Sequence, residues 1–166
     1  MKIAFTGPES SGKTTLAKEI AKKINAQYYP EFSREYLTKR KGIYTKENLD
    51  EIALGQFELI NQNDYDLQVY DTEMLVIQIW SEFKYNTCSK TISELTEKQE
   101  IDHFFLCSPD IPYEEDPLRE CPEQRDELFK IYLNKLTTYK VSYTIVKGTH
   151  FERLEKSLDI ILNLLK

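Results

Sequence analysis

The sequence predicts an α/β fold in which a five-stranded parallel sheet carries helices on both faces. Short apolar segments with the composition of strands alternate with longer segments whose apolar residues recur at helical spacing, an order typical of strands joined by crossover helices. The first strand runs into a glycine-rich loop at residues 7–14, and a helical stripe follows the loop directly. A chain of 166 residues suits one such domain, so we expect a single domain over residues 1–166.

Five short segments have the composition of strands. Residues 103–107 are almost wholly apolar, which is typical of a central strand that is buried on both faces. Pro30 ends the second strand, because proline lacks the amide hydrogen that a strand interior needs. The predicted strands are residues 2–6, 27–29, 67–70, 103–107 and 142–146.

The segments between the strands carry apolar stripes of helical period. Residues 74–85 are apolar almost all round, which is expected of a buried helix, and Thr45 has the side chain of an N-cap. Four of the six prolines fall in residues 108–122, which predicts an ordered loop, and we expect a lid over about 109–126. The predicted helices are residues 15–24, 31–37, about 46–63, 74–85, 92–99, 123–139 and 151–165.

The charge balance argues against one class of partner. The formal net charge is −6 and the pI is near 5.1, whereas a nucleic-acid-binding domain carries a basic stripe. The one basic run, residues 39–41, is predicted to be a solvated helix end. We therefore expect a small-molecule substrate and no nucleic acid.

The sequence indicates a cytoplasmic protein that is not embedded in a membrane. Three cysteines at irregular spacing fit reduced thiols better than disulfides or a zinc site, and two isolated histidines form no metal-ligand pattern. No charged-then-apolar leader begins the chain, and its longest apolar runs are too short to span a bilayer.

Residues 7–14 fit the pattern G-x-x-x-x-G-K-[ST], the P-loop that cradles phosphate groups. Its glycines let successive backbone N–H groups turn inward, and the following helix adds its positive end. Lys13 would then reach the β- and γ-phosphates of ATP, and the Thr14 hydroxyl would hold Mg²⁺. The alternative is a loop of small residues that only turns a strand into a helix. The residues expected to bind ATP are Gly7, Glu9, Ser10, Ser11, Gly12, Lys13, Thr14, Thr15 and Gly148.

Several polar groups follow predicted strands and should therefore meet. Parallel sheets of this kind bind ligands at the carboxyl ends of their strands. The P-loop, Glu31, Asp71, the proline-rich loop and Gly148 all lie at such ends. We expect them to face one crevice.

Carboxylates at these ends could serve phosphoryl transfer. Asp71 is placed as a Walker B carboxylate that orients Mg²⁺ or its waters, although a helix N-cap is the alternative. Glu31 is placed to accept a proton from a substrate hydroxyl, and Glu73 is the rival base. Arg34 would hold substrate or phosphate, or else form a surface ion pair with Glu31 or Glu35.

Two arginines near the proline-rich loop are candidate lid residues. Arg119 and Arg125 could neutralise charge on the transferring phosphoryl group, as arginines on closing lids do. The alternative is a set of local salt bridges with the acidic residues around them. Those residues are Glu114, Glu115, Asp116 and Glu120.

Five segments of the sequence, taken together, carry a family likeness. They are Gly-Pro-Glu-Ser-Ser-Gly-Lys-Thr at 7–14, Glu-Phe-Ser-Arg-Glu at 31–35, Ala-Leu-Gly-Gln at 53–56, Asp-Thr-Glu at 71–73 with Gln78 and Tyr85, and Asp-Pro-Leu-Arg at 116–119. In this order, and over nearly the whole chain, they resemble the ribosylnicotinamide kinase domain of the bacterial NadR-type NAD-salvage proteins.

The resemblance implies a P-loop NTPase fold like that of nucleoside and nucleotide kinases, and transfer of the ATP γ-phosphate to the 5′-hydroxyl of nicotinamide riboside. By that likeness Lys13 and Thr14 handle phosphate and magnesium, Asp71 lies at the Mg²⁺ site, and Arg119 belongs to the lid. The residues implied to bind the nucleoside are Glu31, Phe32, Arg34, Glu35, Asp71, Thr72 and Glu73. Trp80 is expected on a separate ground, as one of the aromatic residues that could supply a stacking wall for a flat heterocycle.

The chain departs from the family at one informative position. An aromatic residue that would face the pyridine ring precedes the Glu-Phe-Ser-Arg-Glu segment in the family, and here that residue is Pro30. Phe32, Tyr29 or Trp80 could replace it. The departure keeps open one alternative, a kinase for another nucleoside or nucleotide. A non-catalytic ATP-binding module is a separate alternative, from a different class of function. The family is often fused to adenylyltransferase and DNA-binding domains, so a separate adenylyltransferase partner is a further expectation.

Overall fold

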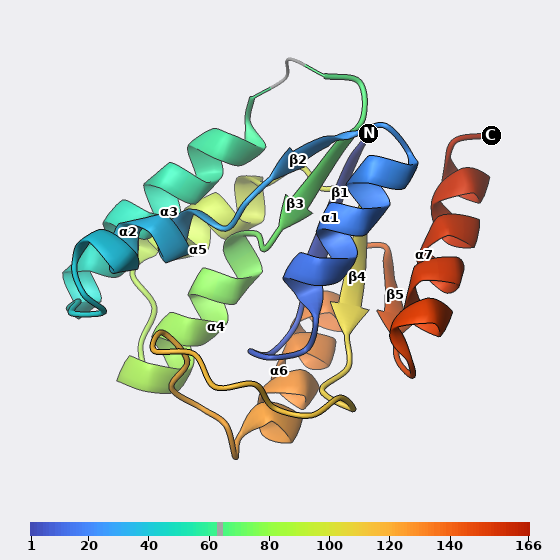
Figure 1. The fold of residues 1–166 in the computed structure, drawn as a ribbon. Helices are drawn as coiled ribbons and strands as arrows, with labels where there is room; N and C mark the ends of the chain where they lie inside the picture. Colours follow the sequence, from blue (N-terminus) through green and yellow to red (C-terminus); the bar gives the residue numbers. More distant parts are fainter. Residues whose placement is uncertain (63–64) are drawn as a thin grey trace.

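A five-stranded parallel sheet forms the centre of the computed structural model, which describes residues 1–62 and 65–166 (Figure 1). The strand order is β2-β3-β1-β4-β5, and all four strand pairs are parallel. The predicted fold class is therefore confirmed. The strands are β1 Lys2–Thr6, β2 Gln27–Tyr29, β3 Gln68–Asp71, β4 His103–Cys107 and β5 Tyr143–Val146.

Each predicted helix is present, with boundaries that shift by a few residues. The helix predicted at about 46–63 ends at Ile60, and its predicted last residue, Asn63, lies outside the described residues. The last part of the predicted lid, residues 125–126, is already helical. The helices are α1 Lys13–Lys23, α2 Phe32–Lys39, α3 Lys46–Ile60, α4 Met74–Tyr85, α5 Lys90–Lys98, α6 Arg125–Thr138 and α7 His150–Leu164.

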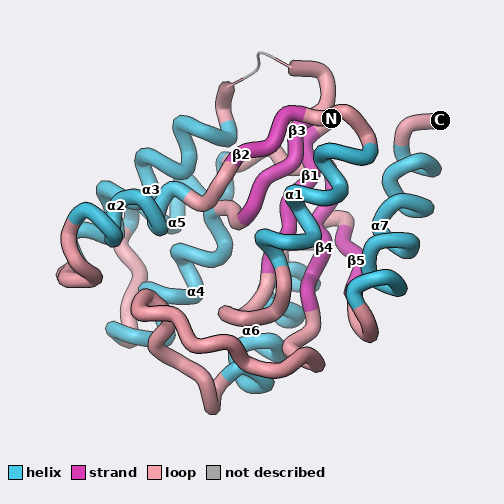
Figure 2. The backbone as a smooth tube through the Cα atoms, viewed as in Figure 1, coloured by secondary structure: helices cyan, strands magenta, loops and turns pink. Residues whose placement is uncertain are grey.

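The sheet is buried on both faces because alternate strand residues enter two separate cores. Ile3 and Phe5 of β1 pack in a cluster with residues of α1 and α7, whereas Ala4 between them packs in a second cluster with residues of α3, α4, α5 and α6. Figure 2 shows the strands lying between these two layers of helices. None of the helices in the described part of the chain is long and apolar enough to cross a bilayer.

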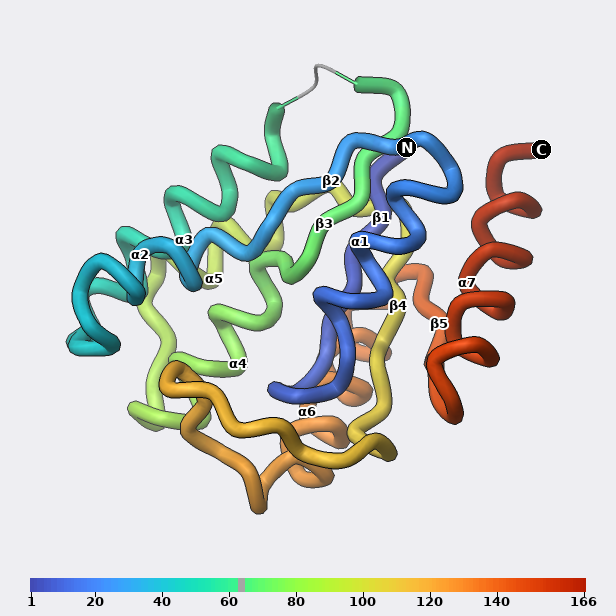
Figure 3. Tube along the Cα trace, viewed as in Figure 1, coloured from blue at the N-terminus to red at the C-terminus, as the bar shows by residue number. Residues whose placement is uncertain are grey.

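The register of the strands brings distant segments to one edge of the sheet. Phe5 lies opposite Asp71 on β3, and Tyr29 on β2 lies opposite Tyr70. The segments that leave the carboxyl ends of β1, β2 and β3 are therefore neighbours. The loop of residues 108–124, which joins β4 to α6, crosses the same edge (Figure 3).

The start of α7 shows how local sequence fixes this edge. Thr149 and Glu152 form a capping box, in which the Thr149 hydroxyl accepts a bond from the Glu152 amide and Glu152 accepts one from the Thr149 amide. Gly148 precedes the cap with a φ of 91°, a conformation that favours glycine. This turn holds the carboxyl end of β5 beside the P-loop helix, because α7 packs against α1.

Candidate functional site

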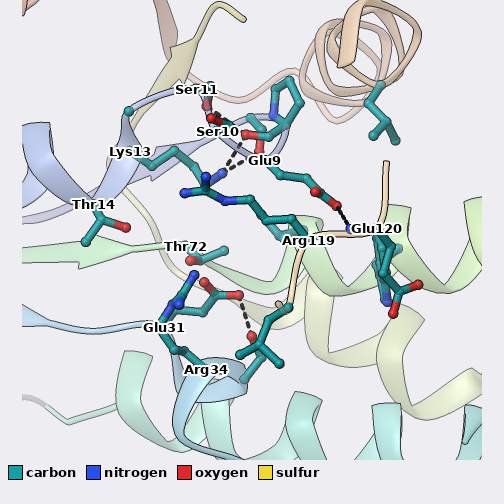
Figure 4. Close-up of a pocket in the computed structure, with 18 of the residues that line it drawn as sticks. Glu9, Ser10, Ser11, Lys13, Thr14, Glu31, Arg34, Thr72, Arg119 and Glu120 are labelled. Atoms are coloured by element: carbon teal, nitrogen blue, oxygen red, sulfur yellow. Dashed lines mark hydrogen bonds between the residues drawn. The ribbon is translucent and has the colours of Figure 1, made fainter. Parts of the chain in front are cut away.

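A cavity of about 410 Å³ opens at the carboxyl edge of the sheet. Its size lies in the usual range for small-molecule sites. In Figure 4 the labelled side chains surround one space, with the P-loop on one side and Glu31 and Arg34 on the other. The predicted site residues that line it are Gly7, Glu9, Ser10, Ser11, Gly12, Lys13, Thr14, Thr15, Glu31, Arg34, Thr72, Trp80 and Arg119.

The P-loop has the geometry of an anion cradle. Gly7 has a φ of 130°, and a Cβ atom there would lie 2.7 Å from the carbonyl oxygen of Cys107, so only glycine fits against the end of β4. The Lys13 ammonium donates to the carbonyl oxygens of Gly7 and Pro8, at 2.9 and 2.7 Å, and so curls back over the loop. Helix α1 begins at Lys13, so its positive N-terminal end adjoins the loop.

Arg153, which the sequence did not suggest, holds this cradle in place. Its guanidinium is 3% exposed and donates to the carbonyl oxygens of Ser11, Ser108 and Gly148 and to the Asp110 carboxylate. One side chain on α7 thus ties the P-loop to the carboxyl ends of β4 and β5. The available signal was a charged residue on the buried face of an amphipathic helix, where charges are rare unless they are paired.

Asp71 ends β3 with one carboxylate oxygen free. Its side chain is buried, and Oδ2 accepts a hydrogen bond of 3.2 Å from the Tyr28 hydroxyl. Oδ1 is buried and has no hydrogen-bond partner among the described residues. Asp71 does not itself line the cavity, but the next residue in the chain, Thr72, does.

Glu31 lies at the opposite wall with a carboxyl whose pKa is raised. Burial is the main cause, and the negative charge of Asp71 adds to it. A hydrogen bond from the Ser33 hydroxyl and the positive charges of Lys13 and Arg34 act in the other direction without cancelling the shift. A partly buried carboxyl with a raised pKa, within the electrostatic influence of the P-loop lysine, is suited to accept a proton.

The residues present fit a magnesium ion of the kind that accompanies ATP. Mg²⁺ is usually held by one or two carboxylates together with substrate phosphates and water. The buried free oxygen of Asp71 is such a carboxylate, and Thr14 offers its hydroxyl at the cavity wall. Among the described residues no group of three or more His, Cys, Asp or Glu side chains is arranged to hold a metal by itself.

Thr72 is a strained residue at the centre of the site. Its φ is 81°, which a β-branched residue rarely adopts, and its amide donates to the carbonyl of Phe5 on β1. Its hydroxyl is buried, faces the cavity wall and has no hydrogen-bond partner among the described residues. Strain of this kind persists where the surrounding structure enforces it, and it is frequent at functional sites.

The two predicted lid arginines have different surroundings. Arg119 lines the cavity, and one of its N–H groups donates to the carbonyl of Glu114 in its own loop. Arg125 does not line the cavity. Its guanidinium donates to the carbonyl oxygens of Ser10, Pro109 and Ile111, so it fastens the loop to the P-loop. The structure therefore does not bring Arg125 to the position that charge stabilisation would need.

Side chains of the P-loop also hold the loop of residues 108–124. Glu9 accepts hydrogen bonds from the amides of Glu120 and Cys121, at 3.0 and 3.3 Å. The Ser10 hydroxyl accepts one of 2.8 Å from the Glu114 amide. The loop is thus docked over the phosphate cradle by contacts with the variable positions of the motif.

Arg34 joins the same loop from the other wall. It forms an ion pair of 2.9 Å with Asp116, rather than with Glu31 or Glu35 as the alternative interpretation proposed. Glu35 instead pairs with Lys39 on the exposed side of α2, and so lies away from the cavity.

Aromatic side chains form part of the cavity wall. Trp80 lines the cavity, and its indole N–H donates to the Tyr44 hydroxyl at 2.6 Å. Lys84 donates to the same hydroxyl at 2.8 Å and pairs with Glu120 at 2.7 Å. Burial raises the pKa of Tyr44 to about 12, so its hydroxyl stays protonated at neutral pH.

Of the three aromatics considered as replacements at the position of Pro30, Trp80 alone lines the cavity. Tyr29 stacks on Tyr70 inside the core with ring centroids 4.8 Å apart. The ring of Phe32 packs against Gly55, where a Cβ atom would lie 2.2 Å from it. Pro30 itself is exposed.

Two further predicted residues have structural partners instead of a place on the wall. Glu73 is wholly buried and accepts bonds from the Leu75 amide, the Thr6 hydroxyl and the Gln99 amide group. Burial raises its pKa, but it caps α4 and does not line the cavity, which removes it as the rival base. The Gly148 amide donates to Asp110 at the rim. Polar wall residues that the sequence did not suggest include Tyr44, His150 and Arg153.

Comparison with known proteins agrees with this geometry. The family model described as an AAA domain matches residues 2–153. No protein of curated function matches the chain in sequence.

Three solved structures illustrate the structural similarity. NadR in complex with NR has a TM-score of 0.76 at 19% identity, with 95% of this chain and 48% of NadR covered. Deoxyadenosine kinase from M. mycoides with dCMP and dCDP has a TM-score of 0.71 at 16% identity, with 98% and 100% covered. Thymidylate kinase from Ehrlichia chaffeensis has a TM-score of 0.69 at 15% identity, with 100% and 98% covered.

These similarities establish the P-loop fold of nucleoside and nucleotide kinases. The chain spans about half the length of the NadR chains that it matches.

Proposed function

The chain belongs to the AAA domain family, and we propose that it is a kinase that transfers the γ-phosphate of ATP to a nucleoside hydroxyl. The leading acceptor is the 5′-hydroxyl of nicotinamide riboside, which would give nicotinamide mononucleotide. The observation that carries the proposal is the shared cavity: Lys13, Arg119 and Glu31 line one space beside the free oxygen of Asp71.

The proposed reaction assigns a separate task to each wall. The 5′-oxygen of the acceptor attacks the γ-phosphorus while its proton passes to the Glu31 carboxylate. The bond between the γ-phosphorus and the β,γ-bridging oxygen breaks, and ADP leaves. Lys13 and Arg119 would stabilise the charge that develops on the phosphoryl oxygens, which is the main contribution of a protein to this chemistry.

Mg²⁺ would be held by Thr14 and by the free oxygen of Asp71, directly or through water. When bound, it would supply positive charge that neutralises phosphate charge. Tyr28 fixes the orientation of the Asp71 carboxylate, because it occupies the other oxygen.

The pairing of cations supports a nucleoside acceptor over a nucleoside monophosphate. A monophosphate would require a second phosphate site, for which Arg34 and residues 39–41 are the candidates. Three of these four cations are paired: Arg34 with Asp116, Lys39 with Glu35, and Arg40 with Glu51; no ion pair of Lys41 is found among the described residues. An acceptor phosphate would have to displace these carboxylates.

The choice of nicotinamide riboside rests on the motif resemblance and on the similarity to NadR, for which a complex with NR is known. Trp80 offers the flat surface that a pyridine ring requires. The similarity to deoxyadenosine kinase keeps purine and pyrimidine deoxynucleosides as a second candidate class. A regulatory ATP-binding module, serving a separate adenylyltransferase, would bind ATP without any transfer.

The test is ADP release from ATP and Mg²⁺ with a panel of acceptors: nicotinamide riboside, deoxyadenosine, thymidine and thymidine monophosphate. We expect the largest stimulation with nicotinamide riboside and formation of its monophosphate. Stimulation by thymidine monophosphate alone would contradict the nucleoside assignment. Tight ATP binding with no stimulation by any acceptor would contradict a kinase.

A further inference from the structure

Gln56 on α3 connects two turns that carry the polar residues of the cavity. Its side chain is 2% exposed. The Oε1 atom accepts a hydrogen bond of 3.0 Å from the Phe32 amide, and the Nε2 atom donates one of 3.3 Å to the Thr72 carbonyl. A buried amide that satisfies both of its ends on different elements fixes their separation.

Both of these partners are backbone groups that would otherwise lack support. Phe32 is the first residue of α2, and the preceding Glu31 supplies no side-chain cap to the helix. Thr72 is the residue with a φ of 81°. Gln56 therefore caps the turn that presents Glu31 and braces the strained turn that follows Asp71.

The neighbouring Gly55 lets the backbone of α3 approach Phe32 closely, which helps to place Gln56 beside these turns. A Cβ atom on Gly55 would lie 2.2 to 2.5 Å from three atoms of the Phe32 ring, so the backbone of α3 packs directly on that ring. The adjacent pair Gly55-Gln56 thus makes two contacts with Phe32, one through van der Waals packing and one through a hydrogen bond.

We infer that Gln56 is a positioning residue that sets the separation between the Glu31 carboxylate and the Asp71–Thr72 turn. This inference rests on the proposed function, in which Glu31 receives the acceptor proton while the other turn lies beside the phosphates. A misplacement of about 1 Å between reacting groups can cost about 100-fold in rate. Gln56 touches neither ATP nor acceptor, since it does not line the cavity.

The experiment compares Gln56→Leu and Gln56→Glu with Gln78→Leu as a matched control. Gln78 is also buried, at 4% exposed, and is hydrogen-bonded at both ends of its amide: it accepts from the Tyr139 hydroxyl and donates to Glu82 on its own helix. It lies outside the cavity wall. Both leucine variants lose a buried amide, so their losses of stability should be similar.

We expect Gln56→Leu to lower kcat for transfer to the best acceptor by about 30- to 100-fold. The ATP dissociation constant and the acceptor-independent ATP hydrolysis should stay within about twofold of wild type, because neither needs Glu31 in place. Gln78→Leu should retain nearly all transfer. If both leucine variants lose transfer equally, Gln56 has only a structural role and the inference is wrong.

Amide hydrogen exchange of Phe32 provides a readout that does not depend on catalysis. Exchange should accelerate in Gln56→Leu, which removes the acceptor, and stay slow in Gln56→Glu, which retains one. Gln56→Glu should still lose transfer, since its second oxygen would face the Thr72 carbonyl. Full transfer in Gln56→Glu would overturn the inference. A wild-type protein that transfers to no acceptor would refute the proposed function instead.

Discussion

The two sides of the cavity are built in different ways. The nucleotide side is one continuous segment, from the end of β1 through the P-loop into α1, and its polar groups are mostly backbone amides and carbonyls. The acceptor side is assembled from the start of α2, the turn after β3, the wall of α4 and the loop of residues 108–124. Side-chain bonds such as Arg34 to Asp116 and Lys84 to Glu120 join these pieces.

This difference has consequences for what each side tolerates. A phosphate cradle made of backbone groups depends on conformation, and glycines with positive φ supply it. A wall made of paired side chains can change its pairings while the fold stays the same. Mutations on the nucleotide side should therefore abolish most of the activity, whereas mutations on the acceptor side should reduce activity by smaller amounts.

The largest effect should come from Lys13→Ala on the nucleotide side. Loss of the ammonium that is proposed to contact the phosphates should lower turnover by about 100- to 1000-fold, as removal of one charge-stabilising group does in other enzymes. The melting temperature should change little, because Lys13 bonds only to carbonyls of its own loop. Lys22→Ala, on the exposed end of the same helix, is the control. Turnover near wild type in Lys13→Ala would contradict the phosphate role.

The next largest effect should be a loss of stability in Arg153→Met. Removing the guanidinium leaves the carbonyls of Ser11, Ser108 and Gly148 without their donor in a buried region. Breaking such a buried network costs about 3–5 kcal/mol, or about 10 °C in Tm for a domain of this size. Lys156→Met, which removes an exposed cation from the same helix, should cost far less. Equal losses in the two variants, by thermal or urea unfolding, would show that Arg153 does not brace the cradle.

The contrast between these two residues explains what the sequence could predict. Lys13 belongs to a motif of fixed spacing, so its role follows from local geometry alone. Arg153 acts only because α7 packs against α1 and brings it to three strand and loop ends. A single sequence shows the buried stripe of α7 but not which helix will meet it.

The fold was more predictable than the acceptor side for a related physical reason. Strand and helix periodicities are local signals, and the strand-end rule places Glu31 and the P-loop at one edge correctly. This rule does not predict in which direction a side chain points once the strand has ended. Glu73 and Glu35 come shortly after β3 and β2, and neither lines the cavity: Glu73 caps α4, and Glu35 faces solvent on α2. Arg125 and Arg119 also differ: Arg125 begins α6 and donates to three carbonyl oxygens, whereas Arg119 lies in the loop before α6 and lines the cavity.

Arg119→Ala should test whether the acceptor side responds by degrees. We expect kcat to fall by about 10- to 100-fold, with ATP affinity almost unchanged, because the charge is needed most in the transition state. Arg40→Ala, at the end of α2 and not part of the cavity wall, should leave both quantities at wild-type levels. A loss confined to ATP affinity would make Arg119 a ground-state contact of the nucleotide side.

The smallest predicted effect concerns stability and the carboxyl of Glu31. Burial and the charge of Asp71 raise its pKa, so over a window above the usual value of about 4.3 the folded protein retains a proton that the unfolded chain has released. Stability from this group is therefore present at low pH and lost as the pH rises through the window. Glu31→Gln should remove the loss, so the variant gains stability relative to wild type with rising pH.

Glu35→Gln provides a control of opposite sign on the same helix. The hydrogen bond and charge of Lys39 lower the pKa of Glu35, so this carboxylate contributes stability above its usual pKa. Its removal should cost a little stability as the pH rises toward neutrality. Urea unfolding of wild type and both variants from pH 4 to 8 separates the two. If the difference in the free energy of unfolding between Glu31→Gln and wild type is constant across that range, the surroundings of Glu31 do not raise its pKa. The proposal that Glu31 is the proton acceptor would then lose its electrostatic support.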